Sequence, residues 1–545
     1  MIVDRYGYAT FESQNNLKNL DSSPYIESNI TNIGDINGIN NDMDLTPIQK
    51  FFDGANIFIT GSTGFLGKIL VEKLLRSCPT VSTLYLLVRN KKGKSMEERV
   101  DEMFDDIIFD KMKKECPKFR HKVVGVGGDC VLPTLGLSIQ DKRLLIDEIN
   151  IVFHVAATVR FDEHIKTATA INIRTPRDLL QLSRQMKNLK SYVHVSTVFA
   201  NCIKKVIEEK VYPPGIDGEK LIAMADCVPE NILAQMTPTL LGDYPNTYTF
   251  TKQVAEDLVK REGENLPVTI FRPAIVVSSY KEPCEAWINN MYGPTGVVAG
   301  SGMGLIRSLR ADGNVNANIV PVDMVVNGMI AAAWGVGESY QKSIKENKTF
   351  EMPVYNYETC SKKPITWGEY MENSEKYGLI FPLSKAIWYY SLCLIKYYPV
   401  YLVAIFFLHI IPALLTDTVL LCMGRTPRMM RAYKKIHKYL EVISYFAVRE
   451  WTLKSEGSDR LLEEMTDKDK ELFFMDLRKL DWDKFFQSYL IGIRMYLMQD
   501  PMDTLERSKK RWNRFYYAHQ CLKVVLAIVG LQIAYWLLSS LMKLV

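Results

Sequence analysis

The sequence predicts an α/β fold, in which a doubly wound parallel sheet is followed by a mostly helical C-terminal domain and a C-terminal transmembrane helix. Three observations support this prediction. Residues 56–68 have the pattern of a buried strand, a glycine turn and the start of a helix. Apolar strand patterns recur downstream, separated by stretches long enough for helices. Residues 521–541 are almost wholly apolar and long enough to cross a bilayer.

The glycine turn is the strongest indication of function. Its glycines stand at positions 61, 64 and 67. Gly61 suits a positive φ, Gly64 allows a phosphate to approach the backbone, and Gly67 lets the helix pack against the strand. Tight turns of other kinds also use glycine, but between two apolar strands the pattern predicts a dinucleotide site. Its candidate binding residues are Thr60, Gly61, Thr63, Gly64, Phe65, Leu66 and Gly67.

Basic residues after the next strand pattern, residues 84–88, indicate which dinucleotide binds. An NAD site would place an acidic residue there for the ribose hydroxyl, whereas this chain has Arg89 and, three residues later, Lys92. Their cationic groups suit a 2′-phosphate, so NADPH is favoured over NADH. The alternative is a solvated basic loop.

Two further strand patterns add candidates for the cofactor site. Residues 123–126 lead to Asp129, which can accept a hydrogen bond from the adenine amine, and residues 149–155 lead to the small Ala156, beside which a cofactor can lie. His154, within the second pattern, is expected to be a packed strand residue rather than a catalyst.

A hydroxyl pair and a tyrosine–lysine pair form the candidate catalytic group. Ser196 and Thr197 end the strand pattern that begins at residue 192, and Tyr248 and Lys252 stand four residues apart, on one face of a predicted helix. A nearby ammonium lowers the pKa of a phenol, so Tyr248 can exchange a proton near neutral pH. Lys252 can also bind the nicotinamide ribose, and either hydroxyl can hold a substrate oxygen. The alternative for the tyrosine–lysine pair is an exposed helix face.

The segments TGSTGFLGK, VHVSTVFAN and YTFTK, in this order, resemble the extended short-chain dehydrogenase/reductases, a superfamily with a Rossmann-type fold. The phrase YPNTYTFTKQVAE, the long insert between Thr197 and Tyr248 and the apolar C-terminal region resemble alcohol-forming fatty acyl-CoA reductases. The resemblance covers residues 50–500, roughly. It implies that NADPH reduces a long-chain fatty acyl-CoA to a primary alcohol through an aldehyde, with release of CoA. It favours Thr197 over Ser196 as the active hydroxyl, and Ser196 stays open.

The same resemblance places Arg272 where the superfamily turns toward substrate. The glycine-rich residues 292–304 are expected to form a loop, either a mobile wall over the substrate or a plain flexible connection. Two other functions stay open: a membrane-bound hydroxysteroid-type dehydrogenase of the same superfamily, and a non-catalytic nucleotide-binding membrane scaffold.

Composition narrows the range of partners. The net charge of +5 is too small to indicate nucleic acid binding, and the 10 cysteines are scattered without metal-ligand or disulfide spacing. No metal site is therefore expected, and homo-oligomerisation is left open.

The sequence predicts a division of the chain into a disordered leader (1–48), an NADP-binding reductase domain (49–375), a helical domain (376–506), and a basic linker with a transmembrane tail (507–545).

The tail and a second apolar run concern the membrane. Basic residues between 507 and 514 precede the tail, so the positive-inside rule keeps the catalytic domain cytosolic, with both endoplasmic reticulum and peroxisome open. The run from Pro399 to Leu415 is interrupted by His409 and Pro412. It is expected to be either a buried or membrane-embedded hairpin lining an acyl tunnel, or an ordinary helical core.

Overall fold

The computed structural model describes residues 2–3, 9–10, 44–90 and 93–542. The chain forms two units, Met1–Thr46 and Pro47–Val545. In the first unit the described residues form an antiparallel pair, β1 (Ile2–Val3) and β2 (Ala9–Thr10). Most of the predicted leader lies outside the described residues, as does Lys92.

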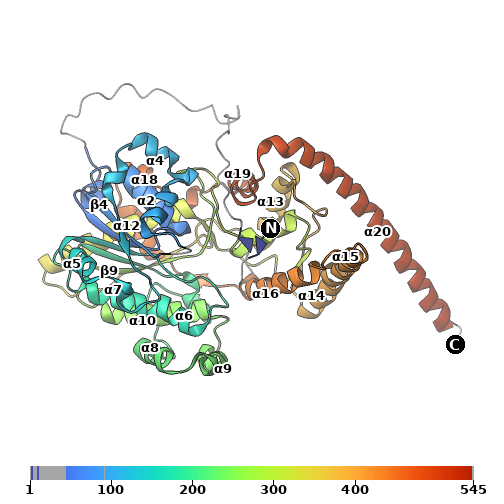
Figure 1. Cartoon of the computed structure of the whole chain (residues 1–545), viewed down its shortest axis with the longest axis horizontal. Coiled ribbons are helices and arrows are strands. Elements are labelled where there is room, and N and C mark those ends of the chain that lie inside the picture. Colours follow the sequence, from blue (N-terminus) through green and yellow to red (C-terminus); the bar gives the residue numbers. More distant parts are fainter. Residues whose placement is uncertain (1, 4–8, 11–43, 91–92, 543–545) are drawn as a thin grey trace. The chain divides into compact units, whose positions relative to one another are not determined.

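A seven-stranded sheet forms the centre of the second unit (Figure 1). Its order is β13–β9–β7–β6–β3–β4–β5, and every neighbouring pair is parallel. The strands are β3 (Asn56–Thr60), β4 (Thr83–Val88), β5 (Val123–Gly127), β6 (Ile151–His154), β7 (Ser191–Val195), β9 (Val268–Pro273) and β13 (Val354–Tyr357). The strand order reverses between β3 and β6, so the predicted doubly wound sheet is confirmed.

Alternating strand residues bury the two faces of the sheet under different helices. Ile57 and Ile59 join the larger core, which includes α2 (Phe65–Ser77) and α12 (Val322–Lys345). Phe58, between them, joins the opposite core. The helices that contribute to that second core are α5 (Ile139–Glu148), α7 (Thr175–Ser183) and α10 (Thr247–Glu262). This alternation is the period of two that a sheet covered on both faces requires.

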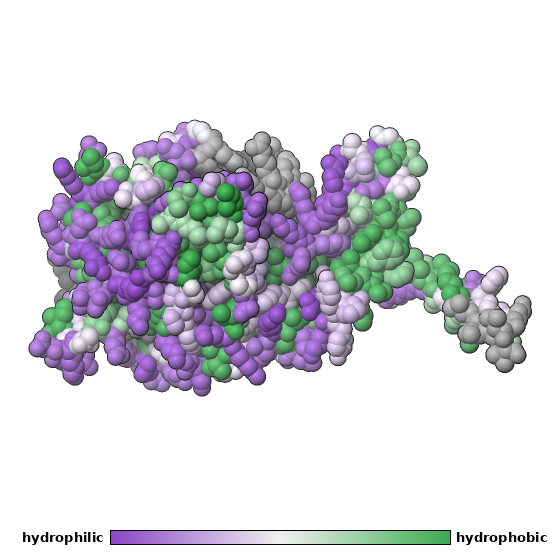
Figure 2. Space-filling model, turned by 90° about the horizontal axis from the view of Figure 1, so that it is seen from below, coloured by the Kyte–Doolittle hydropathy of each residue, from purple (hydrophilic) through white to green (hydrophobic). Residues whose placement is uncertain are grey.

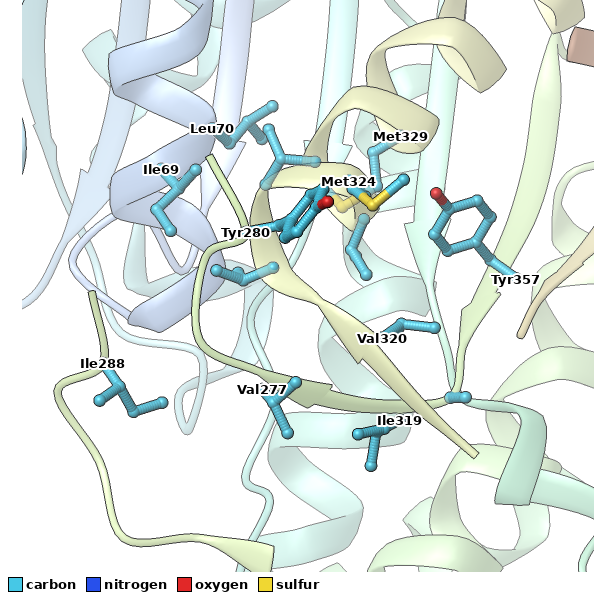
Figure 3. Packing of buried hydrophobic residues seen from close by; sticks show 14 of the residues in the cluster. Ile69, Leu70, Val277, Tyr280, Ile288, Ile319, Val320, Met324, Met329 and Tyr357 are labelled. Atoms are coloured by element: carbon cyan, nitrogen blue, oxygen red, sulfur yellow. The ribbon is translucent and has the colours of Figure 1, made fainter. Parts of the chain in front are cut away.

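A second, short parallel pair extends the larger core. After β9 the chain is interrupted at Ala274, and the next strand, β10 (Ile275–Val277), pairs with β12 (Ile319–Pro321) instead of with the main sheet. Figure 3 shows Tyr280, which follows β10, between Ile69 of α2 and Met324 of α12. This packing connects α2, the helix after the glycine turn, to the β10–β12 pair.

Residues expected to form a glycine-rich loop instead form a helix, α11 (Gly293–Gly302). Its glycines allow neighbours to approach closely. A Cβ on Gly300 would lie 2.6 Å from Cδ1 of Ile306, and one on Gly296 would meet the backbone of Met291 and the ring of Tyr439. The prediction was wrong because these glycines serve contact and not chain flexibility.

The C-terminal region is helical and shares the larger core. Buried residues of this region that belong to the larger core include Leu461, Phe473 and Phe486. The helices used below are α13 (Trp367–Ile380), α14 (Tyr398–Ile405), the π-helical turn η6 (Phe406–Ile410), α15 (Ile411–Cys422), α16 (Met429–Ala447), α18 (Asp467–Leu472) and α20 (Leu505–Met542). Helix α13 runs across the predicted boundary at residue 375, and the domain division stays a prediction.

Buried ion pairs and a hydrogen bond connect α2 to the C-terminal region. The ammonium of Lys73 lies 2.8 Å from Oε1 of Glu282 and donates to the carbonyl oxygen of Leu472, at the end of α18, over 2.7 Å. Arg76 pairs with Glu72 and Glu282. A buried ammonium needs such partners, so these contacts hold the helix that begins at the glycine turn.

Candidate active site

The glycine turn joins β3 to α2. Gly61 has φ of +74°, and a Cβ there would lie 2.7 Å from the backbone nitrogen of Ala156. A Cβ on Gly67 would meet the carbonyl oxygen of Gly61. Gly64 precedes the helix, and no described side chain caps the first N–H groups of α2. The turn thus excludes side chains and directs N–H groups to a place where a phosphate can bind.

Thr60 ties this turn to the neighbouring strand. Its hydroxyl lies 2.8 Å from Nδ1 of His154 and accepts a hydrogen bond from the backbone N–H of Ala156 at 3.2 Å. His154 is buried beside His194, with ring centroids 5.3 Å apart. Burial lowers the pKa of His154 to about 3, so the imidazole is neutral. Of the other predicted turn residues, Phe65 stacks on Trp287.

The candidate 2′-phosphate site contains an arginine that the sequence reasoning missed. Arg89 follows β4, and its guanidinium lies 3.7 Å from a carboxylate oxygen of Asp129. Arg99, in α3 (Met96–Phe104), donates a hydrogen bond to the carbonyl oxygen of Arg89. Partial burial and the charge of Arg89 lower the pKa of Arg99. The only sequence signal was a basic residue in the first half of the next helix.

Ser196 belongs to a buried ionic group. Its hydroxyl donates to Oε1 of Glu256 at 2.6 Å, and the guanidinium of Arg272 binds both oxygens of the same carboxylate at 2.8 and 2.7 Å. Arg272 and Glu256 are 0% and 1% exposed. At the position where the resemblance expects a turn toward substrate, the Arg272 side chain is therefore buried and its charge is neutralised inside the protein.

Thr197 has a different neighbour, Tyr248. Asn246 caps α10, the helix that holds both Tyr248 and Lys252. The ring of Tyr248 is partly exposed, and burial of its hydroxyl raises the pKa of the phenol, an effect that a hydrogen bond with Thr197 partly offsets. The expected lowering of this pKa by Lys252 is not found: burial raises the pKa, and the opposing effect comes from Thr197.

Lys252 lies deeper than Tyr248. It is 2% exposed and donates to the carbonyl oxygen of Val195 at 2.7 Å. Burial lowers its pKa to about 8, and the charge of Glu256 opposes that shift. Its own charge lowers the pKa values of His154 and His194, which places the ammonium near the carboxyl ends of β6 and β7.

A row of contacting aromatic rings, contributed by distant parts of the chain, begins at Tyr248. The ring of Phe161 lies 5.7 Å from Tyr248 and 5.9 Å from Phe446, centroid to centroid, and Phe446 also contacts Phe199. Phe446 belongs to α16. No sequence signal connects these rings, because only the fold brings residues 161, 199 and 446 together. Apolar surroundings of this kind suit an acyl chain beside the hydroxyls.

Comparison with known proteins assigns this arrangement to a family. Two family models, each described as male sterility protein, match residues 59–329 and 408–500. Fatty acyl-CoA reductase wat of Drosophila melanogaster is 41% identical over 92% of this chain and 94% of its own length. Human fatty acyl-CoA reductase 1 is 39% identical over 86% of this chain and 90% of its own. The chain belongs to the fatty acyl-CoA reductase family. The resemblance stated from the motifs is thereby confirmed.

Solved structures support the fold of this fatty acyl-CoA reductase family member. The terminal R domain of the myxalamid PKS-NRPS pathway matches with a TM-score of 0.50 at 19% identity, covering 82% of this chain and 93% of that one. A reductase domain of a nonribosomal peptide synthetase from Mycobacterium tuberculosis gives 0.51 at 16% identity, with coverage of 81% and 92%. These matches show the fold. The glycine turn and the family match over residues 59–329 identify it as an NAD(P)-binding Rossmann domain.

Proposed function

We propose that this member of the fatty acyl-CoA reductase family reduces long-chain fatty acyl-CoA to the primary alcohol, with NADPH as reductant and an aldehyde as intermediate. The observation that carries the proposal is the grouping of Thr197, Tyr248 and Lys252 at the carboxyl end of β7, in the parallel sheet that also carries the glycine turn. Phe161 lies next to the tyrosine, and Phe446 packs on Phe161. The relatives' names give the substrate class.

The hydroxyls act on the oxygen that becomes negative in each reduction. Thr197 donates a hydrogen bond to the thioester oxygen and then to the aldehyde oxygen, and Tyr248 delivers the proton to it. Protonation of the first oxyanion gives a hemithioacetal, which collapses to aldehyde and CoA thiol. The hydroxyl of Ser196 donates a hydrogen bond to Glu256 and so stabilises the buried ionic group next to the reacting residues. The buried ammonium of Lys252 holds the nicotinamide ribose and stabilises the tyrosinate that remains after proton transfer.

The cradle fits a phosphorylated dinucleotide, because the glycine turn excludes side chains and Arg89 and Arg99 lie together beyond β4. NADPH, when bound, supplies the hydride for both reductions. Arg89 and Arg99 are assigned to its 2′-phosphate, Lys92 remains a candidate beside them, and the N-terminus of α2 is assigned to its pyrophosphate.

The cofactor assignment is tested by Arg89→Asp. The variant should lose at least about tenfold in kcat/KM with NADPH and little with NADH, because a carboxylate repels the 2′-phosphate and accepts from a ribose hydroxyl. An unchanged preference for NADPH would refute the assignment.

The membrane assignment rests on two long apolar helices. Among the described residues, Tyr398–Cys422 and Met502–Ser540 are long and apolar enough to cross a membrane. We assign α20 as the anchor, with its basic first half on the cytosolic side together with the catalytic domain. Endoplasmic reticulum and peroxisome both fit this topology.

The reaction is tested with purified protein, NADPH and a series of acyl-CoAs of different chain length. Two NADPH should be consumed for each alcohol and each CoA thiol released. Tyr248→Phe should abolish turnover and leave NADPH binding nearly unchanged. Consumption of one NADPH without CoA release would instead indicate a hydroxysteroid-type dehydrogenase, and no turnover with any substrate would indicate a scaffold.

A further inference from the structure

One side of the helical segment 398–422 is apolar and open to solvent. Its large side chains are between 46% and 64% exposed. We call them the apolar face: Val400, Leu402, Val403, Phe406, Phe407, Leu414, Leu415, Val419 and Leu421. Figure 2 shows hydrophobic residues gathered over α14 and α15. Contiguous exposed apolar surface of this kind marks an interaction site.

Two polar residues of the same segment, His409 and Asp417, are buried and hydrogen-bonded to the rest of the protein. His409 is 0% exposed, accepts from the backbone N–H of Arg307 at 3.0 Å, and lies 3.0 Å from His437 of α16. Asp417 accepts from three backbone N–H groups at the start of α16, at 2.8 to 2.9 Å. Crossing a bilayer would expose both side chains to hydrocarbon without these partners. These contacts therefore argue against the segment as a simple membrane span.

Positive charge adjoins the apolar face. The exposed side of α16 and the turn before it carry Arg425, Arg428, Arg431, Lys434, Lys435 and Lys438, which we call the basic face. Lys438 pairs with Asp162 at 2.8 Å, and Glu441 is an exposed acidic residue on the same helix. A hollow of about 440 Å³ at the junction is lined by Leu420, Arg425, Thr426 and Arg428. Cationic groups beside an apolar helix face complement the headgroups of anionic phospholipids.

We propose that the apolar and basic faces form a membrane-docking surface for anionic phospholipid, distinct from the anchor α20. The hydrophobic side chains enter the acyl region of one leaflet, and the arginines and lysines contact phosphate groups. The charge pattern favours lipid over a second protein chain, because exposed charge in an obligate protein interface is depleted at its core.

Helix α16 connects this surface to the active site. Its first turns carry the basic face, its middle residue Tyr439 donates to the carbonyl oxygen of Met291 at 3.3 Å, and Phe446 near its end contacts Phe161 beside Tyr248. Docking would therefore place the apolar surroundings of Tyr248 close to the leaflet. Only this consequence, delivery of a membrane-held acyl chain, rests on the proposed function.

The test uses the full chain in phosphatidylcholine vesicles with and without phosphatidylserine, containing a phospholipid with a photoreactive diazirine in its acyl chain. After irradiation, adducts are mapped by peptide mass spectrometry. Adducts are expected in residues 398–423 as well as in α20, with more in 398–423 when phosphatidylserine is present. Because labelling needs no turnover, its failure is distinct from failure of the reductase proposal.

A charge-reversed variant and a matched control make the test specific. Arg431→Glu/Lys434→Glu/Lys435→Glu should reduce labelling of 398–423 by at least about tenfold relative to α20. The control, Lys111→Glu/Lys114→Glu/Lys118→Glu, makes the same charge change at exposed positions that are remote in sequence from residues 398–438, and it should leave this labelling unchanged. Adducts confined to α20, equal loss in both variants, or chain-to-chain crosslinks through 398–423 in place of lipid adducts would overturn the proposal.

Discussion

Ser196 and Thr197 are neighbours, yet their hydroxyls have different partners. Ser196 donates to a buried carboxylate at 2.6 Å, whereas Thr197 donates to the carbonyl oxygen of Pro273 over a longer 3.3 Å and also interacts with the hydroxyl of Tyr248. Because the Ser196 hydroxyl already donates its proton to Glu256, it cannot also donate a hydrogen bond to a substrate oxygen that becomes negative. In the proposed mechanism, Ser196 therefore serves stability and its neighbour Thr197 serves catalysis.

Alanine at each position should give opposite results. Thr197→Ala should lower kcat by about 100-fold with little change in the thermal midpoint, because it removes a donor to the oxyanion. Ser196→Ala should lower the free energy of unfolding by about 1 to 3 kcal/mol, because a buried charged acceptor loses a donor. Steady-state kinetics and denaturant unfolding measure the two effects. A larger loss of kcat in Ser196→Ala would reverse the assignment.

Lys252 should give the reaction an alkaline limit. Burial lowers its pKa to about 8, so kcat/KM should fall as pH rises through that value and the ammonium is lost. Stability runs in the other direction. An exposed lysine keeps its proton up to about 10.5, so the unfolded chain binds more protons between pH 8 and 10.5, and the contribution of Lys252 to the free energy of unfolding rises there.

Lys252→Arg checks this explanation, because a guanidinium keeps its charge in the same pH range. The residual activity of the variant should lack the decline above pH 8, approximately. If wild type and variant decline at the same pH, another group sets the limit.

For single residues, the sequence predicted which side chains belong to the candidate site better than it predicted their burial and their hydrogen-bond partners. The four-residue spacing of Tyr248 and Lys252 predicted a shared helix face, and α10 has it. The direction of the Tyr248 pKa shift and the place of Arg272 depend on burial and on Glu256, which spacing alone does not reveal. Arg99 was missed for the same reason, since only the fold shows that it reaches Arg89.

Among the elements, the β3–α2 turn is the most constrained. Gly67→Ala places a Cβ against the carbonyl oxygen of Gly61, so the turn must open. We expect a loss of about 1 to 3 kcal/mol in the free energy of unfolding and a weaker affinity for NADPH. The matched control is Gly215→Ala, where a Cβ meets nothing within 4 Å. Thermal unfolding and cofactor titration measure both, and equal behaviour of the two variants would contradict the prediction.

Strands were easier to predict than the helix α11. Buried parallel strands need continuous apolar runs, and those runs are visible in the sequence of β3, β4 and β6. Helix α11 contains glycines at both ends and within, which favours a loop on local propensity. Close contacts with Ile306 and Tyr439 outweigh that propensity, and the sequence does not display them.

For the whole molecule, the tail and the body should be separable. The described side chains from residue 521 onward are almost all exposed, so removing residues 521–545 should shift the thermal midpoint by less than about 2 °C. Binding to neutral vesicles should be lost, whereas anionic vesicles should retain part of it through the basic face. Flotation assays measure both, and complete loss on anionic vesicles would leave α20 as the sole attachment.

The continuity of the larger core has a consequence for biosynthesis. The same core contains Ile57 of β3 and Met498, and the ammonium of Lys73 is bonded to the carbonyl oxygen of Leu472. A nascent chain that has emerged from the ribosome only as far as β13, the last strand of the main sheet, still lacks the C-terminal partners of α2, such as Leu472. Folding of the reductase body must therefore wait for the helices up to residue 498. The apolar tail emerges after them, so it reaches the membrane attached to a body whose core sequence is already complete.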